Sequence, residues 1–160
     1  MNLHVVLREL ARLARRAASL PMTELLVMSH AAVALLVVEL LIRWVPLPRL
    51  SRILGVRLDL SPAPVVQEEP VALDLPHSAQ VRLRNTSRVA DRWPFCKGPC
   101  LRRSLVTAHL LRAYDPAIRL GTAGSGDTLR AHAWVEIDDR PLEDVAGYAV
   151  LHVPYHRSPT

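Results

Sequence analysis

The feature that most constrains the fold is one long apolar segment, residues 24–45 (ELLVMSHAAVALLVVELLIRWV). A helix of this length is about long enough to cross a bilayer, so a membrane span is one interpretation. Ser29, His30 and Glu39 interrupt the apolar run, however, and Arg43 lies near its end. These polar residues favour a second interpretation, in which a helix that is apolar on nearly every side packs inside or along a globular protein. We therefore expect a buried or peripheral helix.

Prolines divide the chain into two parts. Residues 60–77 contain four prolines and no glycine, which predicts a semi-rigid connector over 61–77. Before it, residues 1–60 form an N-terminal helical part that includes an amphipathic basic helix over 3–19. After it, residues 78–160 form the second part. The chain start has no evident cleavable signal peptide, so we expect a cytoplasmic protein, and the N-terminal helices leave peripheral contact with a membrane open.

The basic residues are unevenly placed. The chain has a formal net charge of +5, and Lys97 is its one lysine among 20 basic residues. Most of the excess lies in residues 1–60, while the rest of the chain is close to neutral. No nucleic-acid motif and no basic patch with interleaved aromatic residues is present. We therefore expect no nucleic-acid partner.

Two cysteines, Cys96 and Cys100, lie four residues apart. This spacing supports neither a disulfide framework, nor a CxxC redox motif, nor a metal site. We expect no metal and no cofactor, and the sequence leaves any ATP dependence open. Pro99 suits a first helical position, and an apolar pattern at helical spacing follows it, which predicts a helix from about Cys100 to Tyr114. A thiol at a helix start lies at the positive end of the helix dipole, which favours the thiolate.

Downstream, the sequence predicts two strands, at 117–122 and 129–137. The second alternates strictly and places His132, Trp134 and Glu136 on one face. If the following hairpin is centred on Asp138, Asp144 lies directly across from His132. If the turn differs by one residue, Glu143 or Asp139 takes that place. A cysteine at a helix start, a strand histidine and a cross-strand carboxylate can together form a nucleophile, base and orienting acid.

The segments CLRRSLVTAHLL (100–111) and RAHAWVEIDDRPL (130–142) resemble the B2 proteins of lasso peptide biosynthesis, which are transglutaminase-like cysteine leader peptidases. The resemblance is strong over 93–144 and weaker over 24–55. It implies an α+β fold with a papain/transglutaminase-like core, in which a helix bearing the cysteine packs on a small antiparallel sheet bearing histidine and aspartate. An N-terminal helical part completes that fold.

By this resemblance, Cys100 is the nucleophile, His132 the general base and then acid, and Asp144 the orienting carboxylate. The implied activity is that of a cysteine endopeptidase, which cleaves the leader from a ribosomally made lasso precursor and frees the core N-terminus for cyclisation in antibiotic biosynthesis. The implied partners are the lasso precursor peptide, a separate B1-type precursor-recognition protein and the lasso cyclase. The amide of Cys100 could serve an oxyanion hole, and no second donor is evident before it.

Several interpretations stay open at this stage. Trp134 either walls the substrate site or packs inside the protein. Arg102 and Arg103 are expected to form a solvated helix face, and Glu136 is either solvated or paired with an arginine. Two other functions fit the same residues, namely a non-catalytic transglutaminase-like scaffold of a peptide-maturation complex and an acyltransferase on the same fold.

Overall fold

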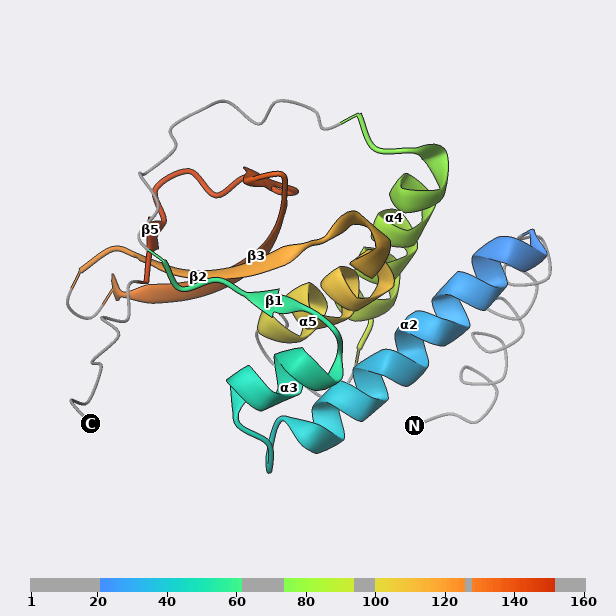
Figure 1. Cartoon of the computed structure of the whole chain (residues 1–160), viewed down its shortest axis with the longest axis horizontal. Coiled ribbons are helices and arrows are strands. Elements are labelled where there is room, and N and C mark those ends of the chain that lie inside the picture. Colours follow the sequence, from blue (N-terminus) through green and yellow to red (C-terminus); the bar gives the residue numbers. More distant parts are fainter. Residues whose placement is uncertain (1–20, 62–73, 94–99, 126–127, 152–160) are drawn as a thin grey trace, which may run out of the picture.

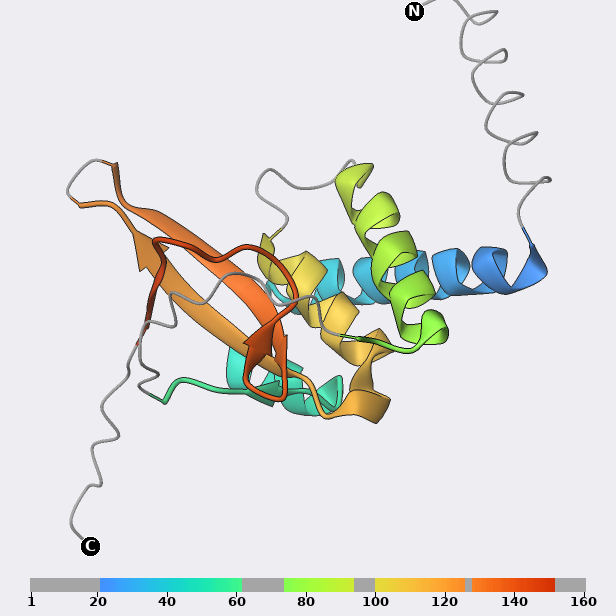
Figure 2. The same cartoon turned by 90° about the horizontal axis from the view of Figure 1, so that it is seen from above.

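The computed structural model of the chain describes residues 21–61, 74–93, 100–125 and 128–151 (Figure 1). The helix expected over 3–19, Cys96 and most of the connector at 61–77 lie outside these residues. Within the described ranges, the helices pack against a small sheet. Figures 1 and 2 show that α5 lies between the sheet and the two other long helices, α2 and α4.

The described residues form four helices, one short 3-10 turn and five strands. The helices are α2 (Met22–Leu41), α3 (Leu47–Ile53), α4 (His77–Asp91) and α5 (Cys100–Leu110), followed by a short 3-10 turn, η1 (Arg112–Tyr114). The strands are β1 (Arg57–Leu58), β2 (Ala117–Ala123), β3 (Arg130–Ile137), β4 (Arg140–Pro141) and β5 (Ala149–Val150).

Proline and glycine set several of these boundaries. A proline stands directly before each of three helices, namely Pro21, Pro46 and Pro76. A missing backbone N–H at this position removes no hydrogen bond of the helix. Gly55 has φ +67° and ends α3, and the amide of the next residue, Val56, donates to the carbonyl of Ser51 across 2.9 Å. That bond belongs to the Schellman motif, which satisfies carbonyls at a helix end.

The sheet is built around the hairpin of β2 and β3. Its order is β1-β2-β3-β4, and β5 also pairs with β2. The pairing of β1 with β2 is parallel, whereas the other pairs are antiparallel. β1 lies before the connector, in a part that the sequence predicted to be helical. The N-terminal part therefore also contributes a short strand to the sheet.

One hydrophobic core joins the parts on either side of the connector. Leu35 and Val38 of α2 pack in the same cluster as Leu105 of α5, Ile118 of β2 and Val135 of β3. The predicted division at 61–77 therefore separates segments that share a core, and the division into domains stays a prediction. The apolar helix is peripheral, since one face packs on α4 and α5 while the other is exposed.

Candidate active site

The start of α5 lies against the strand that carries His132. α5 begins at Cys100, whose thiol is free and partly buried. Ser104 follows one turn later on the same helix face. Its hydroxyl donates to the carbonyl oxygen of Ala133 across 2.7 Å. Because Ala133 follows His132 on β3, this buried bond brings the Cys100 end of the helix to the His132 region of the sheet.

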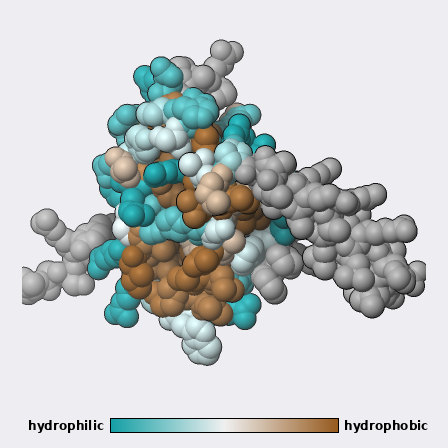
Figure 3. Space-filling view, turned by 90° about the vertical axis from the view of Figure 1, so that its right-hand side faces the viewer, coloured by the Kyte–Doolittle hydropathy of each residue, from teal (hydrophilic) through white to brown (hydrophobic). Residues whose placement is uncertain are grey.

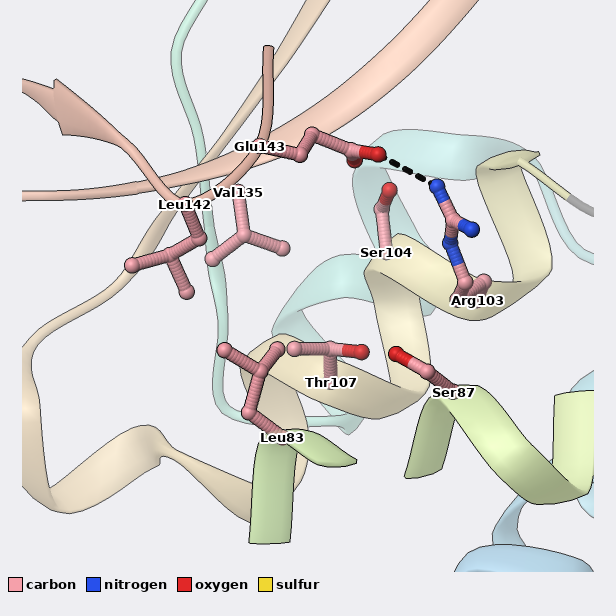
Figure 4. Close-up of a pocket in the computed structure, with 8 residues that line it drawn as sticks. All are labelled: Leu83, Ser87, Arg103, Ser104, Thr107, Val135, Leu142 and Glu143. Carbon is pink, nitrogen blue, oxygen red and sulfur yellow. Dashed lines mark hydrogen bonds and ion pairs between the residues drawn. The ribbon is translucent and has the colours of Figure 1, made fainter. Parts of the chain in front are cut away.

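The carboxylate nearest His132 belongs to Glu143. Its Oε1 lies 3.8 Å from Nε2 of His132, which is longer than a hydrogen bond. The other oxygen, Oε2, forms an ion pair with the Arg103 guanidinium (Figure 4). Since Arg103 is on α5, Glu143 links the helix that begins at Cys100 with the strand that bears His132.

Asp144 does not lie across from His132, because the hairpin register differs from the expected one. Asp138 and Asp139 form a two-residue turn with φ of +52° and +59°, as in the turns that match the twist of a sheet. Ile137 pairs with Arg140, so the hairpin is centred between the two aspartates, and the expected centre at Asp138 is wrong. The pairing ends before it reaches His132. The Asp144 carboxylate instead accepts a hydrogen bond from the Ala146 amide across 2.9 Å.

A cavity of about 280 Å³ opens beside Glu143 (Figure 4). Helices α4 and α5, strand β3 and the segment after β4 line it. The lining side chains are Leu83, Ser87, Arg103, Ser104, Thr107, Val135, Leu142 and Glu143. Its wall is thus apolar in part, with hydroxyl groups and one ion pair, and it adjoins the carboxylate that faces His132.

Two aromatic rings lie against the imidazole of His132. The indole of Trp134 is nearly parallel to it, with ring centroids 6.2 Å apart and an interplanar angle of 21°. The centroid of the Tyr148 ring lies 5.0 Å from the centroid of the imidazole. Trp134 is only 2% exposed, so its indole packs inside the protein in this structure. A role for Trp134 in substrate binding stays a prediction.

A buried network holds the Trp134 indole in place. Its Nε1 donates to Oε1 of Glu136 across 2.8 Å. The other oxygen of Glu136 accepts a hydrogen bond from Nε of Arg119 across 2.9 Å. The Arg119 guanidinium also lies 3.2 Å from the Asp59 carboxylate and donates to the Ser61 carbonyl oxygen across 3.0 Å. Of the two interpretations of Glu136, pairing with an arginine is therefore confirmed.

The Asp59 carboxyl at the end of this network has a shifted pKa. Its partial burial opposes ionisation, but hydrogen bonds from the hydroxyl and amide of Ser61, together with the Arg119 guanidinium, act in the other direction. The net effect lowers the pKa of Asp59 below its ordinary value of 3.8. The charged form is therefore the one that the fold stabilises.

A second buried carboxylate, Glu39 of α2, faces the start of α5. It accepts a hydrogen bond from Nε of Arg102 across 2.6 Å and one from the exposed Arg43 across 3.2 Å. The expected solvated face of Arg102 and Arg103 is thus wrong, because each side chain turns to a carboxylate on a neighbouring element. These two ion pairs flank the first turn of the helix that begins at Cys100.

A family model for the transglutaminase-like superfamily matches residues 34–153. The chain belongs to this superfamily. The match starts inside α2 and runs through the whole described sheet, so it contains Cys100, His132 and Asp144. Neither the curated proteins nor the solved structures gave a significant match.

Membership of the transglutaminase-like superfamily confirms the expected α+β fold, with a papain-like core and an N-terminal helical part. It suggests a cysteine protease or an acyltransferase-type activity, since the fold commonly carries Cys-His-Asp catalysis. In the parts of the chain that the structure describes, no three His, Cys, Asp or Glu side chains group together as metal ligands.

Sequence reasoning missed several residues around the site. Tyr148 follows β4 in a segment without periodic pattern, so nothing in the sequence pointed to its contact with His132. Arg119 and Glu136 lie on the same face of the sheet, on neighbouring strands. Only the observed register shows that their side chains form an ion pair. Glu39 did carry a signal, because an acid in a long apolar helix needs a partner when it is buried.

Proposed function

We propose that this chain is a cysteine endopeptidase that cleaves the leader from a lasso peptide precursor. The observation that carries the proposal is the 2.7 Å bond from Ser104 to Ala133, which packs the helix starting at Cys100 against the strand bearing His132. A thiol at a helix start beside an imidazole is the arrangement that nucleophilic acyl chemistry requires. The superfamily supports the chemistry, and the resemblance of residues 93–144 to the B2 proteins supports the substrate.

In the proposed reaction, the Cys100 thiolate attacks the carbonyl carbon at the junction of leader and core. The protonated His132 then gives its proton to the amine of the core peptide, which leaves as the C–N bond breaks. His132 next accepts a proton from water, and the resulting hydroxide attacks the acyl carbon. The C–S bond breaks, the leader leaves as a carboxylic acid, and the Cys100 thiolate and the protonated His132 are restored. The freed α-amine is the group that the partner cyclase would join to an acidic side chain.

We propose Asp144 as the carboxylate that orients His132, on the basis of its spacing in the resemblance. Glu143 is nearer in this structure, but it is already paired with Arg103 and lies beyond hydrogen-bond distance of the imidazole. Asp144 is the next residue along the chain and is exposed, and we propose that a local change of this loop brings it to His132. In the cleavage assay we expect Asp144→Asn to lose about 100-fold or more in rate and Glu143→Gln much less. The reverse order would assign the role to Glu143.

The deciding experiment is mass spectrometry of a lasso precursor incubated with the protein and its B1-type recognition protein, with and without ATP. We expect the wild type to release leader and core with the mass of one added water, and Cys100→Ala to release neither. Release by both proteins would overturn the role of Cys100. A leader joined to an added amine, with no water incorporated, would indicate the acyltransferase.

A second experiment needs no substrate and separates a scaffold from an enzyme. In a Cys96→Ser background, the rate of Cys100 alkylation by iodoacetamide measures how much thiolate is present. We expect His132→Ala to slow alkylation about tenfold at neutral pH, because the imidazolium no longer stabilises the thiolate. Equal rates in the two proteins would contradict a functional Cys100–His132 pair and favour the scaffold. We place the reaction in the cytoplasm.

A further inference from the structure

The two sides of α2 differ in what covers them. Buried residues on one side, such as Ala31, Leu35 and Val38, pack into the core. Along the other side runs a row of exposed apolar side chains, here named the α2 stripe, which consists of Met22, Leu26, Val33, Leu36, Val37 and Leu40. Trp44, just past the end of the helix, is 86% exposed. Figure 3 shows apolar side chains gathered in a broad patch on this side of the molecule, bordered by hydrophilic ones.

The stripe follows one side of the helix, and the exposed Ser29 and His30 lie between Leu26 and Val33 along it. Its residues follow one another at intervals that keep them within an arc of about 100° on a helix of 3.6 residues per turn. From Met22 to Leu40 the stripe extends about 27 Å at 1.5 Å per residue. Soluble proteins rarely expose an apolar surface of this extent without an occupant.

Two ordinary explanations of so apolar a helix do not fit α2. Among the described residues, α2 is the helix that is long and apolar enough to cross a membrane, yet only 28% of its most apolar stretch is buried, so it is not a core helix. It is not a free-standing span either. Its inner side carries the buried Glu39, which pairs with Arg102 of α5, and it packs on α4 and α5. The helix therefore belongs to the folded domain and offers one side outward.

The charges around the α2 stripe are positive. Arg43 lies at the end of α2, and Arg49 and Arg52 are exposed on α3, which follows directly. The two acids of α2, Glu24 and Glu39, are both neutralised by arginines. The 20 residues before α2 in the sequence add four arginines against one acid. An apolar stripe near exposed arginines complements a surface that is apolar inside and anionic outside, and an exposed tryptophan suits the boundary of such a surface.

We propose that the α2 stripe is a binding surface for a membrane that contains anionic lipid, with α2 lying in the plane of the interface. The apolar side chains enter the acyl boundary while the arginines contact lipid phosphate groups. Because α5 packs on the opposite side of α2, the Cys100 end of the molecule stays turned away from the bilayer. This inference does not depend on the proposed peptidase activity.

Vesicle flotation of the full chain tests the proposal directly. We expect the protein to float with vesicles of phosphatidylcholine and phosphatidylglycerol (7:3), at least tenfold more strongly than with phosphatidylcholine alone. Raising the salt concentration from 0.1 to 0.5 M should weaken this preference. Equal partition into both vesicle types, or no partition into either, would overturn the proposal.

Variants then locate the surface. Val33→Glu combined with Leu40→Glu should reduce binding at least tenfold, because two charges enter the acyl boundary. Leu129→Glu is the matched control, since Leu129 is 60% exposed on the loop before β3, away from α2, and should bind as the wild type does. Arg49→Gln with Arg52→Gln should lose mainly the preference for anionic vesicles. Because all these side chains are exposed, the circular dichroism spectrum should be unchanged.

Two further outcomes would show that the α2 stripe is not a membrane-binding surface. If light scattering without lipid shows a dimer that the Val33→Glu, Leu40→Glu variant converts to monomer, and vesicles do not compete for that dimer, the stripe pairs with a second copy. If the stripe variant floats as well as the Leu129→Glu control does, membrane binding does not use the stripe. Either result overturns the proposal.

Discussion

Two buried carboxylates, Glu39 and Glu136, hold the two halves of the candidate site by different means. Glu39 belongs to a helix and binds Arg102 on the helix that begins at Cys100. Glu136 belongs to the sheet and binds both Arg119 and the indole of Trp134, which stacks on His132. Both acids are buried, but their arginine partners differ in exposure. The Arg102 and Arg43 side chains are partly exposed to water, whereas that of Arg119 is almost fully enclosed.

This difference in exposure determines which half of the site tolerates change. On the nucleophile side, an arginine that loses Glu39 can turn to solvent. On the base side, an arginine that loses Glu136 stays enclosed with Asp59 as its remaining carboxylate partner. We therefore expect the His132 side to be the more rigid and the more costly to alter.

Arg119→Met should have the largest effect. It leaves Glu136 buried without a cation, which costs about 3–5 kcal/mol of unfolding free energy in comparable buried pairs. Urea denaturation followed by circular dichroism measures the loss. The double variant Arg119→Met, Glu136→Leu should recover part of the stability, since it removes the isolated charge. A loss below about 1 kcal/mol would show that the pair behaves like a surface salt bridge.

Glu39→Gln should be the next most damaging change. The amide can still accept one hydrogen bond, and Arg102 can reach water, so we expect a loss of about 1–3 kcal/mol, the range for hydrogen bonds to charged groups. Arg43→Gln is the control, because this exposed partner of Glu39 should contribute about 0–1 kcal/mol. If Glu39→Gln proved more costly than Arg119→Met in the same urea titration, the contrast between the two sides would be wrong.

Gly121→Ala tests how closely the Trp134 indole is packed. A Cβ at this position would lie 2.7 Å from two carbons of the indole and 2.8 Å from the carbonyl oxygen of Ala149. Backbone cannot move aside as a flexible side chain can, so overpacking should cost about 1–3 kcal/mol. Gly55→Ala is a useful comparison, because nothing lies within 4 Å there and only its φ of +67° opposes the change, at about 1–2 kcal/mol. A neutral Gly121→Ala variant would mean that the indole can shift.

The sequence predicts those features of the fold that depend on residues close together in the chain. The start of α5 at Cys100, strand β3 and the alternation that places His132 beside Trp134 and Glu136 follow from periodicity and proline position, and all are confirmed. The hairpin register was predicted wrongly because the same sequence fits a turn centred on Asp138 and a two-residue turn formed by Asp138 and Asp139. The two turns differ in strand register by one residue. The pairing also ends at Pro141, so the segment after β4 determines that Glu143 lies near His132.

Long-range partners were beyond sequence reasoning for a different reason. The pairing of Glu39 with Arg102 joins residues 63 positions apart, and that of Arg119 with Ser61 joins residues 58 apart. Each depends on how whole elements pack, and nineteen arginines offered many partners. An isolated buried acid predicts that some cation will meet it, but the identity of the cation comes from the fold.

The smallest effect, and one that appears only at low pH, is expected from Asp59→Asn. Because the fold lowers the pKa of Asp59, the folded protein binds this proton less readily than the unfolded chain does. The charged carboxylate therefore stabilises the protein above its ordinary pKa, 3.8, and this contribution disappears as the pH falls through the lower, folded value. Urea titrations at pH 7 and near pH 3 should give wild type more stable than Asp59→Asn at neutral pH, with the gap closing in acid. A gap that stays constant with pH would show that the variant acts through lost packing and not through the charge that Asp59 presents to Arg119.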